Sequence, residues 1–299
     1  LSLCACPESP SGPPATAPTP APSQAAQSET IRPPKLIVVL VVDQMREEMI
    51  ERYGPHHQAG FRRLLDDGIR FSNNRHSHAV TYTAPGHASI ATGTHPSQHG
   101  IVANYWVDGE GVRHLAAADP QIEPLGASSG FRGSPSKMQH DALGDWLKAA
   151  HPDAKVWSVA LKDRAAIMMG GQAPDGVLWW NDDPARYVST QHYFEGLPAW
   201  LDPFLAKWPV AELTAKAWEA PASLHASRAK DEATYEGEHS AFPHSLDHFG
   251  GSPGRMMRYT PQGERMHFAL AKAVIENEGL GQDAQTDLLW LGASVSDWI

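Results

Sequence analysis

The stretch Leu36-Ile37-Val38-Val39-Leu40-Val41-Val42, followed directly by Asp43, decides the fold. An unbroken run of apolar residues, most of them β-branched, predicts a central parallel strand that helices cover on both faces. Beyond it, strand-like and helix-like segments alternate, which is typical of an α/β fold with a wound, mostly parallel sheet flanked by helices. The expected strands are 69–71, 155–161, 177–180 and 288–291, and the expected helices are 61–65 (ending at Gly68), 141–150 and 262–278.

Two regions depart from this alternation. Residues 1–34 hold nine of the 25 prolines and too few large apolar side chains to form a core, so we expect a disordered Pro/Ala-rich tether there. The folded domain is then expected at 35–299. Within it, residues 182–258 are rich in Trp, Pro and His and only weakly periodic, and we interpret them as a cap region inserted over one edge of the sheet.

The first residues and the composition limit the cellular context. Leu3-Cys4-Ala5-Cys6 resembles the end of an export signal with a lipoprotein cleavage box, which makes Cys6 a candidate for a lipid anchor and predicts a periplasmic or secreted protein. An incidental cysteine pair in a tail is the open alternative. No cysteine follows Cys6, so the folded domain has neither a disulfide framework nor a thiolate metal site.

Charge and hydropathy exclude further classes of partner. A net charge of −10 argues against a nucleic-acid binder. No apolar run approaches the ~20 residues that a transmembrane helix needs. We therefore expect a small-molecule site on a monomeric protein without a transmembrane span.

Two candidate site residues stand at element boundaries. Asp43 directly follows the strand 36–42, and in open α/β sheets ligands bind beyond the carboxyl ends of strands; a helix N-cap is the alternative. Thr83 opens Thr83-Ala-Pro-Gly-His87, a pattern typical of a turn that enters a helix, where a hydroxyl and unpaired backbone N–H groups suit a phosphate. Simple capping is the alternative for Thr83, and a threonine nucleophile would need activation, most simply by a metal ion.

Three further charged residues follow predicted strands. Lys162 and Arg164 come after the strand 155–161, and in an extended segment residues two apart share a face, so both could reach one anion. A solvated surface pair is the alternative. Asp297 follows the strand 288–291 and supplies a second carboxylate at a strand end.

Taken together and in this order, these segments resemble the alkaline phosphatase superfamily. The resemblance is to the bacterial phosphate-irrepressible alkaline phosphatases, a branch of the type I phosphodiesterase/nucleotide pyrophosphatase family. It extends from residue 36 to the end of the chain. The stretches that carry it are Val41–Met45, Thr83–Thr94 (TAPGHASIATGT), His99–Asn104 (HGIVAN), Leu161–Ala165 (LKDRA), Ala173–Trp179 (APDGVLW) and Thr286–Asp297.

The resemblance implies an alkaline-phosphatase-like catalytic domain with two zinc ions as cofactors. Asp43 and Thr83 would ligate one ion and Asp297 the other. The remaining ligands of such enzymes would lie beyond residue 299, so the chain resembles an N-terminal fragment that is incomplete at its C-terminus. We expect this fragment alone to be inactive.

The resemblance also implies a reaction. Thr83 would attack the phosphorus of a small phosphate monoester and form a phosphothreonine. Asn104, Lys162 and Arg164 would bind the phosphoryl oxygens, and two cations suit the doubly charged monoester better than a singly charged diester. A phosphodiesterase or nucleotide pyrophosphatase is the first alternative, and a non-catalytic phosphate-binding relative the second. His87 stands where sulfatases have Arg, which argues against a sulfatase, and we expect it to pack or hydrogen-bond within its helix.

Overall fold

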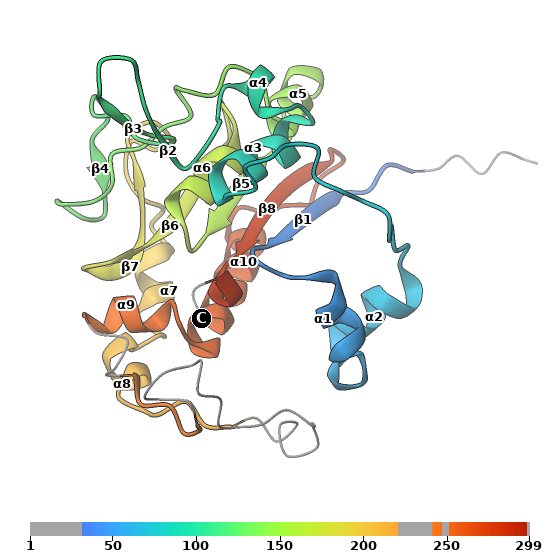
Figure 1. The fold of residues 1–299 in the computed structure, drawn as a ribbon, viewed down its shortest axis with the longest axis vertical. Coiled ribbons are helices and arrows are strands. Elements are labelled where there is room, and N and C mark those ends of the chain that lie inside the picture. The colour runs from blue at the N-terminus through green and yellow to red at the C-terminus, as the bar shows by residue number, and fades with distance from the viewer. Residues whose placement is uncertain (1–31, 221–240, 247–250, 298–299) are drawn as a thin grey trace, which may run out of the picture. The chain divides into compact units, whose positions relative to one another are not determined.

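The computed structural model describes residues 32–220, 241–246 and 251–297. Within the unit Pro34–Ile299 the chain forms a six-stranded sheet (Figure 1). Four neighbouring strands are parallel and two more are antiparallel at one edge, so the prediction of a wound, mostly parallel sheet is confirmed. The strand order is β1 (Leu36–Val42), β8 (Asp287–Ala293), β5 (Val156–Ala160), β6 (Gly176–Asp182), β7 (Ala185–Thr190) and β4 (Pro124–Leu125).

The register of the parallel strands brings three strand ends to one edge of the sheet. Val42 at the end of β1 pairs with Ala293 at the end of β8. Ala160 at the end of β5 pairs with Gly292 near the end of β8. The residues that follow β1, β8 and β5 therefore start from the same edge, which is where ligands bind in open α/β sheets.

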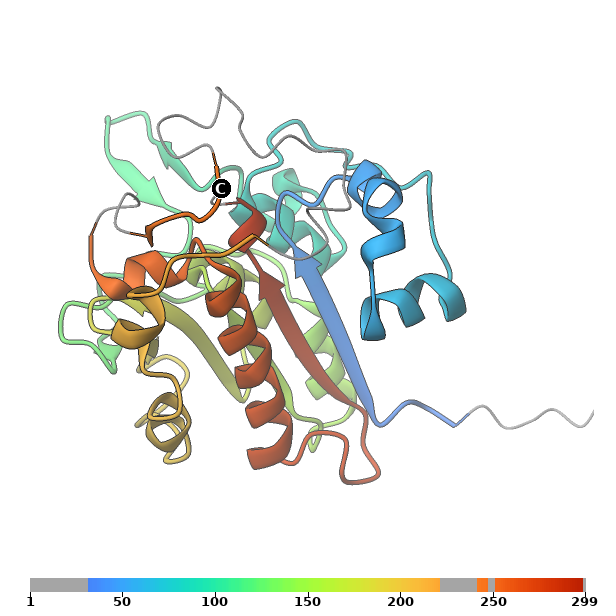
Figure 2. The same cartoon turned by 90° about the horizontal axis from the view of Figure 1, so that it is seen from below.

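Helices cover the sheet on both faces, each over its own apolar cluster. The helices α3 (Thr83–Thr92), α5 (Leu143–Ala150) and α6 (Asp163–Gly170) pack on one face. The helices α7 (Leu201–Leu205), α9 (Pro253–Met257) and α10 (Pro261–Asn277) pack on the other. Figure 2 shows α10 running along β8 with α6 on the far side of the sheet. Strands buried on both faces explain why their sequences read as continuous apolar runs.

The long helix α10 begins and ends at residues suited to those positions. Its N-cap Thr260 accepts a hydrogen bond from the backbone N–H of Gly263, and Pro261 occupies the first helical position. Beyond its end, Gly279 adopts a φ of +64°, a conformation that favours glycine. The predicted bounds of 262–278 agree closely with this helix.

The structure corrects two predictions about the first strands. Within the described residues β1 pairs with β8 alone, and Ile37, Val38 and Leu40 are between 38% and 48% exposed, so β1 is an edge strand and not a central one. The apolar sequence of β1 indicates that the strand is favoured in a buried position, but it does not show how many other strands pair with it. No strand forms at 69–71, where Ile69 and Phe71 are 85% and 80% exposed in an irregular segment after α2 (Ala59–Asp67).

The other described elements are short and connect these layers. They are α1 (Glu47–Arg52), η1 (Gly54–His56), α4 (Pro96–His99), the hairpin β2 (Tyr105–Val107) and β3 (Arg113–Leu115), α8 (Val210–Thr214) and η5 (Val295–Asp297). Because β7 joins the main sheet, the start of the expected cap region at 182–258 has to move beyond residue 190. Residues 221–240 and 247–250 of that region, and residues 1–31 of the expected tether with Cys6, lie outside the described residues. Among the described helices, none has the length and apolar character needed to cross a membrane.

Candidate active site

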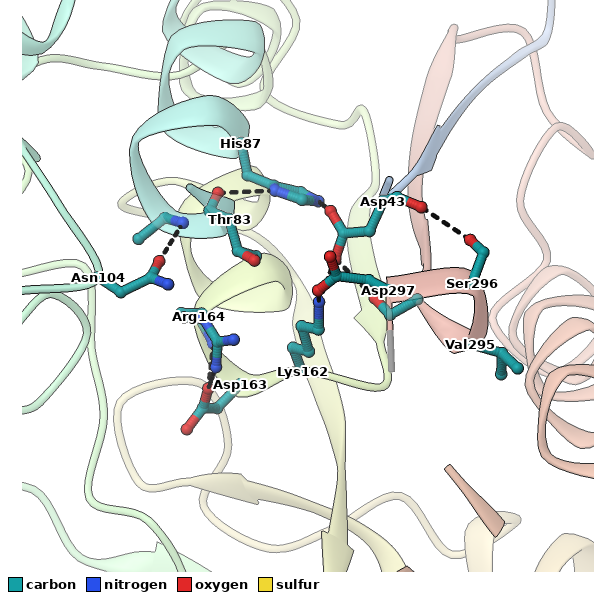
Figure 3. Close-up of polar contacts among 12 residues, drawn as sticks. Asp43, Thr83, His87, Asn104, Lys162, Asp163, Arg164, Val295, Ser296 and Asp297 are labelled. Atoms are coloured by element: carbon teal, nitrogen blue, oxygen red, sulfur yellow. Dashed lines mark hydrogen bonds and ion pairs between the residues drawn. The ribbon is translucent and has the colours of Figure 1, made fainter. Parts of the chain in front are cut away.

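Three charged side chains meet where β1, β8 and β5 end (Figure 3). The ammonium of Lys162 lies 2.7 Å from Asp43 Oδ2 and also pairs with Asp297 Oδ2. Lys162 is only 3% exposed. Two carboxylates thus share one buried ammonium, which leaves this cluster with one net negative charge. Asp43 and Asp297, which sequence reasoning placed at strand ends, do come together.

The loop after β8 holds Asp43 by three hydrogen bonds. The backbone N–H of Asp43 donates to Ala293 O at 2.9 Å, Ser294 Oγ donates to Asp43 Oδ2 at 3.0 Å, and Ser296 Oγ donates to Asp43 O at 2.7 Å. Sequence reasoning missed both serines, although their place directly after a strand could have revealed them. Since α1 begins at Glu47 with Arg46 as its N-cap, the N-cap alternative for Asp43 is wrong.

Thr83 is the first residue of α3, and its hydroxyl takes part in no hydrogen bond with the described residues. Tyr82 is the N-cap, so Thr83 does not cap the helix. Ala84 and Ala88 are fully buried, and such small side chains allow α3 to pack closely on α6. In the view of Figure 3, Thr83 lies between Asn104 and the carboxylate–ammonium cluster.

Asn104 stands beside the start of α3. Its Oδ1 accepts the backbone N–H of Ala84 at 2.8 Å, directly after Thr83. The amide oxygen is therefore engaged, and the amide nitrogen is the part of the side chain that can donate to a ligand. This geometry agrees with the donor role that the resemblance implies for Asn104.

His87 links the first turn of α3 to Asp43. Its Nδ1 lies 2.8 Å from Thr83 O, so the ring donates an N–H to that carbonyl. Its Nε2 is buried, 3.7 Å from Asp43 Oδ1, without a hydrogen-bond partner in the described part of the chain. Burial lowers the pKa of His87, against the raising effect of Asp43, and so favours the neutral ring. A hydrogen bond within its own helix is what the sequence predicted.

Lys162 and Arg164 have different partners in this structure. Lys162 is the N-cap of α6 and has an extended backbone conformation, and Arg164 is the second residue of the helix. Lys162 meets the carboxylates, whereas the Arg164 guanidinium lies 3.6 Å from Asp163 Oδ1.

Arg164 and Asn104 line one cavity of about 180 Å³. Its wall is mixed, because Asp163 adds a third polar side chain and Leu115 and Phe131 add apolar ones. The cavity joins hydrogen-bond donors to an apolar surface, which is typical of a small-molecule site. Its lining residues are Asn104, Tyr105, Leu115, Ala116, Ala117, Phe131, Asp163 and Arg164.

The donor atoms in this site suit a divalent cation only in part. Asp43 and Asp297 approach one shared cationic atom, and carboxylate oxygens are ligands for zinc. Zinc sites, however, use about three or four protein ligands. The described residues contain no group of three or more His, Cys, Asp or Glu side chains that could hold a metal ion. Asp43 and Asp297 alone are therefore too few ligands for a zinc site.

Comparison with known proteins identifies the family of this chain. Residues 37–261 match the family model for type I phosphodiesterase / nucleotide pyrophosphatase. The chain belongs to this family. Within it, the chain is 36% identical to the alkaline phosphatase PhoK of Sphingomonas sp. over 282 residues, which cover 92% of this chain and 48% of PhoK. It is 33% identical to the alkaline phosphatase PhoV of Synechococcus elongatus, covering 91% of this chain and 51% of PhoV.

Solved structures of the family member PafA, an alkaline phosphatase, share this fold. The wild-type crystal structure superposes with a TM-score of 0.82 at 32% identity, covering 89% of this chain and 54% of PafA. A second crystal structure, also with a TM-score of 0.82, is of a PafA variant in which a Thr is replaced by Ser and an Asn, a Lys and an Arg by Ala. The chain spans about half the length of the curated relatives that it matches.

Proposed function

We propose that the complete protein is a zinc-dependent alkaline phosphatase that hydrolyses small phosphate monoesters through a phosphothreonine intermediate. The observation that carries this proposal is the hydroxyl of Thr83, which has no hydrogen-bond partner among the described residues and stands at the start of α3. The Asn104 amide accepts a hydrogen bond from the residue after Thr83. His87 donates to the backbone carbonyl of Thr83 and also lies beside the Asp43 carboxylate. A nucleophile, a donor and a carboxylate thus come from three separate segments.

In the proposed reaction, Thr83 Oγ1 attacks phosphorus and loses its proton, and the ester P–O bond breaks. The alcohol leaves as its oxygen gains a proton, and the phosphoryl group stays on Thr83. Water then attacks the phosphothreonine, releasing inorganic phosphate and restoring the hydroxyl. Two zinc ions, one bound by Asp43 and Thr83 and the other by Asp297, each with further ligands from beyond residue 299, would favour the deprotonated hydroxyl and offset phosphoryl charge.

The phosphoryl oxygens would be held by this chain's own donors. Asn104 would donate from its amide nitrogen and Arg164 from its forked guanidinium. Lys162 was expected to share this task. Its ion pairs support a role in holding Asp43 and Asp297 together, with its charge still close to the phosphoryl group.

The PafA variant gives independent support for these residues. Its replaced Thr and Asn are 21 positions apart, and its replaced Lys and Arg are two apart. The same spacings separate Thr83 from Asn104 and Lys162 from Arg164.

We also propose, from Leu3–Cys6, that the protein is exported to the periplasm or secreted, with Cys6 as a lipid anchor. Residues 1–34 would then form a tether, and residues 35–299 part of the catalytic domain.

A phosphodiesterase is the second candidate function, and the apolar side chains in the cavity wall favour it. A second ester group on a phosphate held by Asn104 and Arg164 would find Leu115 and Phe131 beside it. The two functions are separated by turnover of 4-nitrophenyl phosphate and of its methyl diester, measured with the full-length enzyme. We expect the monoester to be cleaved faster. Faster diester cleavage would replace the first function by the second, and phosphate binding without turnover of either would indicate a non-catalytic relative.

A further inference from the structure

Glu264 contacts the site from α10, a helix that carries none of the site residues discussed so far. It lies in the first turn of α10, on the face of the sheet opposite α3 and α6. Its Oε2 accepts the backbone N–H of Val295 at 3.1 Å. Its Oε1 is buried and has no hydrogen-bond partner in the described part of the chain. A carboxylate placed there is costly, because a buried charge loses its hydration.

The backbone that Glu264 holds is the loop that organises both carboxylates of the site. Val295 stands between Ser294 and Ser296, which donate to the side chain and the backbone carbonyl of Asp43. Two residues beyond Val295, Asp297 shares the ammonium of Lys162. A shift of this loop would therefore displace Asp297 and remove two donors from Asp43 together.

We propose that Glu264 is a positioning residue for the metal ligands, acting through the loop 294–297. This inference rests on the proposed function, since it treats Asp43 and Asp297 as ligands. The hydrogen bond from Val295 to Glu264 fixes the position of the loop where it leaves β8. Ser294 and Ser296 of the same loop donate hydrogen bonds to Asp43, so the position of the loop sets that of Asp43. Groups that orient metal ligands in this way typically change metal affinity or activity 10- to 100-fold when they are removed.

Two physical features favour a carboxylate at this position. A hydrogen bond from a backbone N–H to a charged acceptor is stronger than one to a neutral acceptor. A negative charge in the first turn of α10 also interacts favourably with the positive end of the helix dipole. Both effects would hold the loop firmly, and they offset part of the cost of burying the charge.

The test uses the full-length protein and three variants. Glu264→Ala removes the acceptor, Glu264→Gln keeps an acceptor oxygen without the charge, and Glu276→Gln changes an exposed glutamate of the same helix as the matched control. Zinc affinity is measured by competition with a chromogenic chelator, at a temperature where circular dichroism shows each variant to be folded. The values of kcat and KM for 4-nitrophenyl phosphate are then measured at saturating zinc.

We expect Glu264→Ala to lower zinc affinity 10- to 100-fold, with a smaller loss for Glu264→Gln and none for Glu276→Gln. At saturating zinc, the kcat of Glu264→Ala should recover to within a few-fold of wild type. Wild-type zinc affinity in Glu264→Ala would overturn the positioning role, even with a lowered melting temperature. If Glu264→Ala does not fold, the comparison is made with Glu264→Gln instead. A zinc affinity of Glu264→Gln equal to that of Glu276→Gln would then overturn the positioning role.

The same data separate this inference from the proposed function. A wild-type protein that binds zinc but cleaves no phosphate ester overturns the function, while the affinities of the variants still decide the role of Glu264. A wild-type protein that binds no zinc overturns both, and it does so before any variant is compared.

Discussion

Replacing Lys162 by Met tests whether the two carboxylates depend on the ammonium between them. Methionine has a similar length but no charge, so it would leave Asp43 and Asp297 facing each other without the shared cation. Lys162 is 1% exposed in its side chain, Asp43 10% and Asp297 31%. Water can therefore screen only part of the repulsion that the substitution creates.

The size of the effect follows from the distances and the burial. At 2.7 Å and an effective dielectric constant near 20, the attraction between Lys162 and Asp43 is about 6 kcal/mol before desolvation is counted. Removing one partner of a buried ion pair costs roughly 3–5 kcal/mol. Because Asp297 remains partly exposed, we expect Lys162→Met to lower the free energy of unfolding by about 3 kcal/mol in the presence of a chelator. Saturating zinc should recover most of this loss, because the cation then supplies the missing positive charge.

The assay is urea unfolding of the full-length protein with a chelator and with saturating zinc. Lys148→Met is the matched control, since the Lys148 ammonium lies 2.6 Å from Asp175 but the two side chains are 24% and 37% exposed. Such a surface pair contributes below about 1 kcal/mol. The reasoning would be refuted if Lys162→Met and Lys148→Met lost equal stability in chelator.

Three further predictions concern catalysis and acid stability. Thr83→Ala should abolish the acid-trapped phosphothreonine seen by mass spectrometry and nearly all turnover, while Thr83→Ser should keep part of both; full turnover in Thr83→Ala would contradict the nucleophile. Arg164→Ala should lower kcat/KM for the monoester more than for its methyl diester, by about 10-fold or more, and equal losses would indicate a structural residue. Burial lowers the pKa of His267 to about 3, against about 6.5 when unfolded, so below pH 6.5 the unfolded state binds more protons. The contribution of His267 to stability should therefore fall by roughly 2 kcal/mol between pH 7 and pH 5. Urea unfolding of the wild type and of His267→Gln measures it, and equal pH dependence of the two would contradict this.

The sequence predicted the edge of the sheet that holds the site because strand ends are a local signal. Asp43 and Asp297 each follow an apolar run, and parallel strands bring their carboxyl ends to one edge. The pairing of Lys162 with both carboxylates was not predictable in this way. It depends on which strands are neighbours, and β8 lies between β1 and β5 although it comes last in the chain.

Other errors came from patterns with two physical meanings. Lys162-Asp163-Arg164 was predicted to be extended, and Lys162 is extended, but α6 begins at Asp163, an acidic residue that favours a helix start. Ile69–Phe71 has the residues of a strand, yet a short run without a partner strand gains no ladder of hydrogen bonds. Glu264 gave no signal at all, because a glutamate in the first turn of a helix is ordinary and its contact with Val295 joins residues far apart in sequence.

If the protein acts as proposed, the charges of the site predict that a cation has to be present before a phosphate dianion can bind. Asp43, Asp297 and Lys162 together carry one net negative charge, and Arg164 is offset by Asp163 beside it. By itself this arrangement would repel a doubly charged ester. Each divalent cation adds two positive charges, so one such ion reverses the sign of the cluster and a second strengthens the attraction further. Under the proposed function, a loop that keeps the two carboxylates together, through Ser294, Ser296 and Glu264, would therefore control phosphate binding through its effect on the cation and not through contact with the substrate.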